Sequence, residues 1–499
     1  MPKAKRAAQN RLKILMVASE VTPFAKTGGL ADVVGALPKR LHEFGHDVRI
    51  VMPLYSSIHR DTFKKHAAPL GVPIGWGEMW GAVWEGTLPK SDVPIYFLEN
   101  ESLYGRPGVY GEKGRSYDDN LARFTFLSRG ALQLAKYLHW HPDVFHVHDW
   151  MTAVIPLYLN TWERETELGA SASVLTLHNL AHQGSFPKEQ LPTLQLDWNH
   201  FTYLELERYD HINLLKGGIY HSTLIATVSP TYAEEIQTPE FGEGLHEVIR
   251  SRADSLRGIL NGIDETVWNP ETDPNIPAHF SAKKLTGKKT CKKELQKEAG
   301  LPVREDVPLI GMVSRLDAQK GFDVVAEAMP RILDGLDCQL VMLGTGEYWA
   351  ETFFGNLSHH RPDRVQAWIN FDTKLAHRIE AGCDFFLMPS HFEPCGLNQM
   401  YSQRYGTLPI VHAVGGLEDT VDNYDQEKGA GTGFKVHDLN ANSLFDTIGW
   451  ACWAFHNRPK HILAMRRQAM RKHFTWEAPA REYQGVYWEA VRRRRGLSL

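Results

Sequence analysis

Residues 13–52 read KILMVASEVTPFAKTGGLADVVGALPKRLHEFGHDVRIVM, and this stretch decides the fold of the chain. The apolar run at 13–19 predicts a buried strand, and apolar residues recur at helical spacing between 30 and 41. The run VRIVM at 48–52 predicts a second strand, so the stretch forms a βαβ unit with parallel strands. Pro38 lies inside the predicted helix, and we expect it to kink or divide that helix.

The rest of the chain repeats this alternation of short apolar runs and amphipathic stretches. Two series are separated by residues 258–270, whose Gly, Asn, Asp and Pro content indicates a hinge. Further apolar runs predict the other strands, at 144–148, 174–178, 224–228, 309–314, 339–343, 385–388 and 408–411. The pattern therefore predicts an α/β fold of two doubly wound domains in tandem.

Length and composition agree with a two-domain soluble protein. The chain has 499 residues, 43% of them hydrophobic, and a formal net charge of -4. A chain of this length is too long for a single hydrophobic core of ordinary size. The near-neutral net charge gives no reason to expect a nucleic-acid partner. No apolar stretch long enough to span a membrane occurs, and the N-terminus lacks the pattern of a secretory signal. Five cysteines without a Cys-x-x-Cys pair predict a reduced, cytoplasmic protein.

The loop after the first predicted strand has the composition of a phosphate site. Gly28 and Gly29 begin the predicted helix, where backbone amides and the helix dipole favour an anion, and Lys26 adds a cation. A plain turn between strand and helix is the alternative. The sequence Lys-Thr-Gly also occurs in penicillin-binding enzymes, but the order of motifs here does not fit them.

Two more charged positions follow predicted strands in the second series. Arg315 and Lys320 flank the turn after the strand at 309–314, and such a pair can hold a diphosphate, although surface salt bridges would explain it too. Glu393 follows the strand at 385–388. A carboxylate there can bind sugar hydroxyls or stabilise positive charge at an anomeric carbon, and a helix-terminal carboxylate is the alternative.

Two common classes of nucleotide-binding protein are excluded, because their glycine motifs are missing from the sequence. The turn LGTGE contains Gly344, but a dinucleotide fingerprint needs a further glycine where Trp349 stands. No Gly-x4-Gly-Lys-Ser/Thr motif occurs either, which argues against a P-loop NTPase. Gly415 and Gly416 form another turn suited to close approach of backbones.

The histidine-rich run HWHPDVFHVHD at 139–149 does not have metal-ligand spacing. His146 and His148 share one face of a predicted strand, but no further ligand arrives at a suitable interval. We therefore predict no metal, and interpret His148 and Asp149, and likewise His178, as residues of a cleft at the strand ends.

Taken together, the motifs resemble one family. The chain contains, in order, KTGGLADVVGALPK, HDW, TLHNLAHQG, TVSPTYAEEI, GILNGID, SRLDAQKGFD, PSHFEPCGLNQMY and GGLEDTV. These resemble motifs of bacterial glycogen synthases and plant starch synthases. The resemblance implies two Rossmann-like domains of the GT-B type facing across a deep cleft, at residues 1–257 and 258–470. A last segment, 471–499, would carry a helix at 474–490 that crosses back to the first domain.

The resemblance also implies roles for particular residues. Those expected to bind the donor ADP-glucose are Lys26, Gly28, Gly29, Asp32, Asn261, Arg315, Lys320, Phe371, Glu393, Cys395, Gly396, Leu397 and Tyr401. Those expected to act in catalysis are Lys26, His178, Arg315, Lys320 and Glu393. Further candidates for the site are Lys292, as a weaker match to the family, and Asp149 and Gly344, from their places after predicted strands. Tyr401 stands where many retaining enzymes of this architecture have a second glutamate, and Phe371 where a tyrosine often stacks on the base.

The activity implied is that of a retaining transferase that moves glucose from ADP-glucose to the non-reducing end of an α-1,4-glucan. Glycogen or a malto-oligosaccharide would be the acceptor, and no cofactor is expected. Three alternatives stay open: a transferase using UDP-glucose or another acceptor, a sugar-nucleotide epimerase, and a non-catalytic glucan-binding protein. A non-catalytic glucan-binding protein would be expected to have other residues at positions 26, 315 or 393, but Lys26, Arg315 and Glu393 are all present.

Overall fold

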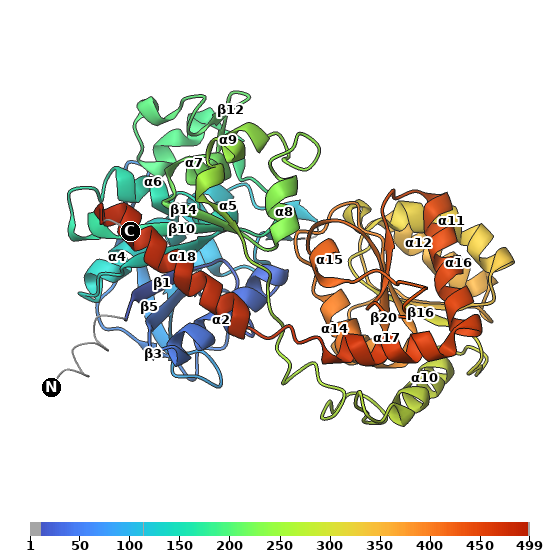
Figure 1. The fold of residues 1–499 in the computed structure, drawn as a ribbon. Helices are drawn as coiled ribbons and strands as arrows, with labels where there is room; N and C mark the ends of the chain where they lie inside the picture. The colour runs from blue at the N-terminus through green and yellow to red at the C-terminus, as the bar shows by residue number, and fades with distance from the viewer. Residues whose placement is uncertain (1–10, 113, 498–499) are drawn as a thin grey trace. The chain divides into compact units, whose positions relative to one another are not determined.

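The computed structural model describes residues 11–112 and 114–497 of the chain (Figure 1). It divides into two compact units. Unit 1 comprises residues up to Gly262 together with those from Trp476 onward, and unit 2 comprises Ile263–Thr475. The units divide about five residues later than the expected boundaries at 257 and 470. The reason is local pairing, because strand β15 (Leu256–Gly258) belongs to the sheet of unit 1, and the Ile263 amide donates to the Phe474 carbonyl, 2.7 Å away, within unit 2.

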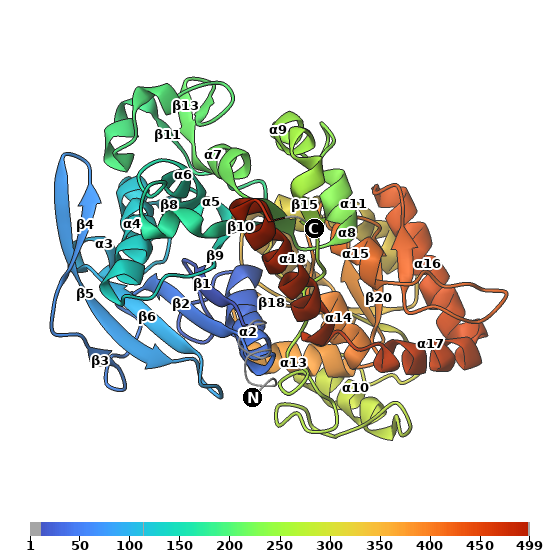
Figure 2. The same ribbon diagram turned by 60° about the vertical axis from the view of Figure 1, so that its left-hand side comes forward.

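Unit 1 is built on a ten-stranded sheet with the order β15-β14-β10-β9-β1-β2-β6-β5-β3, and β4 also pairs with β5. Its other strands are β1 Lys13–Val17, β2 Asp47–Pro53, β3 Lys64–Lys65, β4 Leu70–Ile74, β5 Gly77–Thr87, β6 Pro94–Glu99, β9 Val144–His148, β10 Ala172–Leu177 and β14 Leu224–Thr227. From β6 through β1 to β14 the strands run parallel in the doubly wound order 3-2-1-4-5-6. The antiparallel strands β3, β4 and β5 form an edge that the sequence pattern did not indicate (Figure 2).

The helices and small strands of unit 1 surround this sheet. They are α2 Gly29–Glu43, α3 Glu101–Tyr104, β7 Gly111–Glu112, β8 Arg115–Ser116, α4 Asn120–Tyr137, α5 Asp149–Thr152, α6 Ile155–Asn160, η1 Glu167–Ala170, β11 Ser185–Pro187, η2 Lys188–Leu194, η3 Trp198–His200, β12 Glu207–Arg208, β13 His211–Asn213, α7 Leu214–His221, α8 Pro230–Glu235, α9 His246–Ser251, η4 Ala253–Ser255 and α18 Glu477–Arg495. Helix α2 is continuous, so of the two expected effects of Pro38, a kink or a division of the helix, the division does not occur. Pro38 is buried with the apolar face of α2, and that packing holds the helix together across the missing amide donor.

The last helix, α18, packs on unit 1 beside β10 and α2 (Figure 1). The Tyr487 hydroxyl lies 2.8 Å from His146 Nδ1, and Gln484 Nε2 lies 2.8 Å from His46 Nε2. The helix begins three residues later than predicted and extends beyond residue 490. The segment around Phe474 is not helical, because the Phe474 amide donates to Glu265, 3.1 Å away, and the Phe474 carbonyl accepts from the Ile263 amide.

Unit 2 contains a six-stranded, wholly parallel sheet with the order β18-β17-β16-β19-β20-β21. The strands are β16 Leu309–Val313, β17 Gln339–Leu343, β18 Val365–Trp368, β19 Phe385–Met388, β20 Leu408–His412 and β21 Phe434–Val436. The helices are α10 Thr286–Glu298, η5 Ala318–Lys320, α11 Phe322–Gly335, α12 Tyr348–His360, α13 Thr373–Gly382, α14 Asn398–Arg404, α15 Gly415–Thr420, α16 Ala441–Asn457 and α17 Pro459–Arg471. Phe322, Val325 and Met329 face the core from α11, as their spacing predicted.

The fold prediction is confirmed: both units are doubly wound α/β structures, and the predicted strands match to within two residues at each end. The strand order reverses direction next to β1 in unit 1 and next to β16 in unit 2. Ligands of such sheets bind outside the carboxyl ends of the strands at this switch point. The loops after β1 and β9, and after β16 and β19, are therefore where a site is expected. In the described part of the chain, no helix is long and apolar enough to cross a bilayer.

Candidate active site

In unit 1 the loop after β1 carries Lys26 into solvent at the start of α2. The Lys26 ammonium pairs with Asp32 Oδ1 at 2.7 Å, and the Lys26 side chain is 52% exposed. A side chain added at Gly28 or Gly29 would meet no atom within 4 Å, so the loop borders open space. The structure thus brings together Lys26, Asp32 and both glycines, where an anion can reach the helix N-terminus.

Glu20, which the sequence reasoning missed, closes this loop from inside. Its carboxylate accepts hydrogen bonds from the Thr27 amide, from the Thr27 hydroxyl at 2.7 Å and from the Gly28 amide at 3.2 Å. The Gly28 amide is therefore already bonded to the protein itself. An acidic residue directly after a buried strand was the signal that could have pointed to Glu20.

Two further strand ends of unit 1 contribute a buried polar cluster. His148 Nδ1 lies 3.0 Å from His178 Nε2, and the His178 amide donates to Asp149 Oδ1 at 2.7 Å. Burial lowers the pKa of His178 to about 3 and raises the pKa of Asp149 to about 7. Asp149 has a φ of +51°, a left-handed conformation that aspartate tolerates better than most residues. The cluster therefore holds neutral imidazoles beside a carboxyl group that titrates near neutrality.

A second group of histidines has ligand atoms close enough together for a metal ion: His200, Glu205 and His221. Glu205 Oε2 lies 2.7 Å from His200 Nδ1 and 2.9 Å from His221 Nε2. Asn160 donates to His221 Nδ1, since Arg494 binds the oxygen of the same amide. His221 therefore carries its proton on Nε2 and donates it to Glu205, so hydrogen bonds already account for this group.

In unit 2 the loops after β16 and β19 bring Lys320 and Glu393 together. The Lys320 ammonium lies 2.6 Å from Glu393 Oε2, and the Ser390 hydroxyl donates to the same oxygen at 3.1 Å. Gly321, with φ of +72°, makes this possible: a Cβ there would lie 1.8 Å from the Pro389 carbonyl oxygen. The result is a nearly buried carboxylate paired with a cation at the switch point of the sheet.

The segment from Glu393 to Leu397 rests on the glycine turn that opens α15. The Gly416 amide donates to the Glu393 carbonyl at 3.1 Å. A Cβ on Gly416 would lie 2.1 Å from the Cys395 carbonyl oxygen. The close approach expected at Gly415 and Gly416 is therefore an approach to the chain's own backbone. It holds Glu393, Cys395 and Gly396 in place before α14.

Three further predicted residues of unit 2 follow the carboxyl ends of strands β16, β17 and β18. The Arg315 side chain is 60% exposed and pairs with Asp317 Oδ2 at 3.2 Å. Gly344 lies against the end of β16, because a Cβ there would meet the Ser314 carbonyl oxygen at 1.9 Å. Phe371 follows β18 and is 91% exposed, so its ring is available for stacking.

The remaining predicted residues, Tyr401, Lys292 and Asn261, are all buried. The Tyr401 ring on α14 stacks on Trp268 with centroids 3.9 Å apart. Lys292 is buried, and its ammonium lies 2.7 Å from Asp384 Oδ2 and 3.1 Å from the Glu305 carbonyl. Asn261 is buried near the end of the first part of unit 1.

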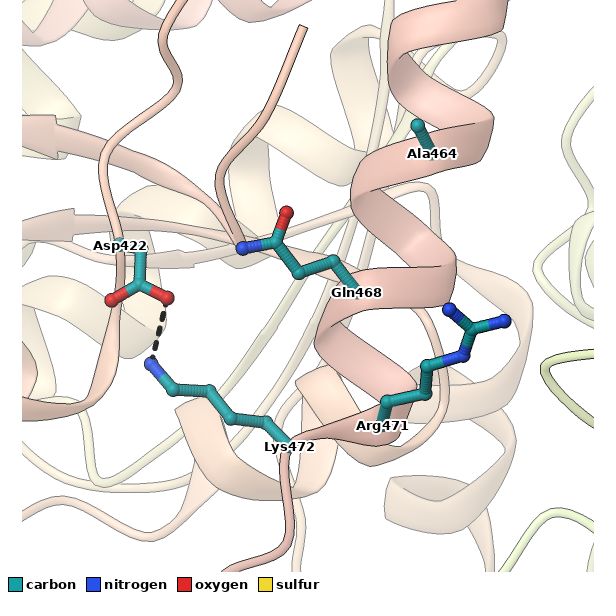
Figure 3. Close-up of a pocket in the computed structure, with 5 residues that line it drawn as sticks. All are labelled: Asp422, Ala464, Gln468, Arg471 and Lys472. Carbon is teal, nitrogen blue, oxygen red and sulfur yellow. Dashed lines mark hydrogen bonds and ion pairs between the residues drawn. The ribbon is translucent and has the colours of Figure 1, made fainter. Parts of the chain in front are cut away.

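A hollow of about 440 Å³ on unit 2 contains none of the predicted site residues (Figure 3). Its polar groups are largely paired. Lys472 Nζ lies 3.0 Å from Asp422 Oδ2, and Gln468 accepts from the Gly431 amide at 3.2 Å. Arg471 points away from the Asp422–Lys472 pair. The hollow is therefore a poor candidate for the active site.

Two doubly wound units in one chain, with cationic and acidic loops at the carboxyl ends of their strands, are the architecture expected of a glycosyltransferase of the two-domain Rossmann-like class. Residues 13–251 match the protein family described as the starch synthase catalytic domain. Residues 293–452 match the family described as glycosyl transferases group 1. Glycogen synthase 1 of Geobacter sulfurreducens is 53% identical and covers 98% of both chains. Glycogen synthase of Treponema denticola is 45% identical over 97% of this chain and 100% of its own.

Among solved structures, the catalytic domain of starch synthase IV from Arabidopsis thaliana, bound to ADP and acarbose, superposes with a TM-score of 0.88. It is 33% identical and covers 96% of this chain and 99% of its own. The chain belongs to the family of glycogen synthases and starch synthases, and the resemblance found in the motifs is confirmed. It is accordingly a retaining glycosyltransferase.

Proposed function

We propose that this protein transfers glucose from ADP-glucose to the non-reducing end of glycogen or a malto-oligosaccharide, forming an α-1,4 bond. The observation that carries the proposal is the Lys320–Glu393 pair at the switch point of unit 2, 2.6 Å between nitrogen and oxygen. A cation suits the diphosphate of the donor, and a carboxylate beside it suits the anomeric carbon. The names of the relatives and the ADP in the solved starch synthase support this choice.

For the donor, we assign the main part of nucleotide-sugar binding to unit 2, and we assign acceptor binding to unit 1. Arg315 and Lys320 would hold the diphosphate, and the exposed ring of Phe371 would stack on the base. Lys26 and the Gly29 amide would contribute further groups for phosphate. These cations stabilise the negative charge that develops on ADP as the glycosidic bond breaks.

For the chemical step, Glu393 stabilises the positive charge that develops on the transferred glucose. The position eight residues later holds Tyr401, whose ring is stacked on Trp268, so no second carboxylate stands there. We therefore favour a mechanism in which the acceptor 4-hydroxyl attacks on the same face from which ADP leaves. The rejected mechanism is one that forms a covalent glycosyl-enzyme intermediate. The departing phosphate accepts the hydroxyl proton, and the anomeric configuration is retained.

Product analysis tests the activity. The protein is incubated with labelled ADP-glucose and glycogen, and the polymer is then digested with an enzyme specific for α-1,4 bonds. We expect label in the polymer that the digestion releases. Faster transfer from UDP-glucose in competition, or release of free sugar without glucan, would contradict the proposal and favour one of the alternatives.

A variant tests the role of Glu393. Glu393→Gln keeps the shape of the side chain and removes its charge, and we expect kcat to fall by about 100-fold or more. Glu327→Gln, at an exposed position on α11 of the same unit, is the matched control. A folded Glu393→Gln protein with unchanged kcat would contradict the proposed mechanism.

A further inference from the structure

Glu20 is a nearly fully buried carboxylate for which the proposed mechanism has no use. It lies just after β1 and is 3% exposed. Beside the bonds from Thr27 and Gly28, its Oε1 accepts a hydrogen bond from the Tyr110 hydroxyl, which also lies 2.8 Å from Ser19 Oγ. Four donors from two segments of the chain therefore converge on one side chain, and hydrogen bonds to a carboxylate are among the stronger ones in proteins.

These bonds determine which groups of the loop face outward. The amides of Thr27 and Gly28 turn inward to Glu20. Gly28 is the residue before α2 and has extended backbone without a side-chain cap. Within the described residues, the Gly29 amide has no acceptor, and open space borders this glycine. An anion arriving at the helix N-terminus would thus meet the Gly29 amide and the Lys26 ammonium, and not the Gly28 amide.

The hydrogen bonds to Glu20 also explain why a buried carboxylate can lie next to a loop that would bind an anion. An unpaired buried carboxylate would repel phosphate and would be costly to desolvate. Here its charge is shared among the two amides and two hydroxyls that donate hydrogen bonds to it. The same bonds fix the curvature of residues 20–28, from which the Lys26 side chain emerges.

We propose that Glu20 is a positioning residue for the donor diphosphate: it occupies the Thr27 and Gly28 amides so that the loop presents only Lys26 and Gly29. The inference rests on the proposed function, and Glu20 acts through the loop without touching the substrate. Tyr110 completes the arrangement by tying Glu20 to the segment that precedes α4.

The test compares Glu20→Gln with the unchanged protein. An amide side chain turns an N–H group toward donors that need an acceptor, so the loop loses at least one charged hydrogen bond. We expect the Kd for ADP and the KM for ADP-glucose to rise by roughly tenfold or more, while the KM for glycogen stays unchanged. Ser19→Ala, which removes a partner of Tyr110 and none of Glu20, is the matched control and should bind ADP normally.

Binding of ADP is measured by calorimetry, and folding is checked by circular dichroism. If Glu20→Gln does not fold, the variants Thr27→Val and Tyr110→Phe test the inference in its place. Each removes one hydroxyl that donates to Glu20 and leaves the Thr27 and Gly28 amides as donors. We expect each to raise the Kd for ADP by a few-fold, roughly what one hydrogen bond contributes. A normal Kd in the folded variants would overturn the inference, as would an equal loss of glycogen affinity. Failure of the unchanged protein to bind ADP would instead overturn the proposed function.

Discussion

Lys292 illustrates how a single residue can match a family pattern and still lie away from the site loops. Its ammonium is enclosed in unit 2, where Asp384 and backbone carbonyls surround it. A second cation, Arg466, pairs with the other oxygen of Asp384 at 2.6 Å. Such a group contributes to the free energy of unfolding, and we infer that any effect on activity is indirect.

We predict that Lys292→Met lowers the free energy of unfolding by about 3 kcal/mol, because Asp384 is left buried with one partner fewer. Urea unfolding followed by circular dichroism measures this change. Lys289→Met on the same helix breaks an exposed pair with Glu305 and should change stability by less than about 1 kcal/mol. A stable Lys292→Met protein without activity would show that the residue acts in catalysis after all.

Asp149 gives a prediction for pH dependence. Burial raises its pKa to about 7 in the folded protein, whereas the unfolded chain has the ordinary value near 3.8. Between these values the folded protein holds a proton that the unfolded chain has released. The contribution of this group to stability is therefore present at low pH and declines as the pH rises through that window.

The variant Asp149→Asn cannot titrate, keeps the oxygen that accepts from the His178 amide and suits the positive φ. We expect its free energy of unfolding to match that of the unchanged protein near pH about 4 and to exceed it above pH about 7. Buried His148 and His178 titrate in both proteins, so the difference isolates Asp149. Equal stability of the two proteins at every pH would contradict the raised pKa.

At the scale of elements, the loops that follow parallel strands carry every charged group of the proposed mechanism. In unit 2, the turn at the start of α15 supports the loop after β19 through the hydrogen bond from the Gly416 amide to the Glu393 carbonyl. A contact of this kind depends on the absence of side chains: a Cβ on Gly415 would lie 2.1 Å from the Glu393 carbonyl oxygen, and a Cβ on Gly416 would lie 2.1 Å from the Cys395 carbonyl oxygen, two residues after Glu393.

We predict that Gly416→Ala lowers kcat by about tenfold or more, since the added methyl group must displace the backbone at Cys395 by a distance that active sites do not tolerate. Gly449→Ala, inside helix α16, is the control. Its Cβ would lie 3.7 Å from the nearest atom, and the change should stabilise the helix by up to about 1 kcal/mol. Unaltered kinetics of Gly416→Ala would show that the turn does not position Glu393.

At the scale of the whole molecule, the two units differ in how the chain builds them. Unit 2 is one continuous segment with its own core, whereas unit 1 combines two segments, one that ends at Gly262 and one that begins at Trp476. Helix α18 covers His146 and the strands next to it, and Tyr483 and Tyr487 are fully buried there. Removing α18 would expose these apolar and polar groups together.

We predict that residues 263–475 fold alone and unfold cooperatively, because the sheet and its helices are complete within that segment. Residues 1–262 alone should be unstable and should gain structure when residues 476–499 are added as a peptide. Circular dichroism and thermal unfolding of the fragments check both statements. A stably folded 1–262 fragment would contradict the role assigned to α18.

The sequence by itself determined the α/β class, the position of most strands, the family and the loops in which charged residues occur. It could do so because buried parallel strands are local apolar runs, and glycine turns and charged loops are local as well. The antiparallel edge at β3 to β5 escaped notice because its strands are partly exposed and lack a clear apolar run.

Only the tertiary structure decided which charged groups have partners. Lys320 meets Glu393 across 73 positions of sequence, Tyr110 meets Glu20 across 90, and Lys292 is enclosed by Asp384. A carboxylate or an ammonium has the same one-letter code whether it is exposed or buried. Its role follows from the donors, acceptors and water that surround it, and packing of segments distant in the chain sets that environment.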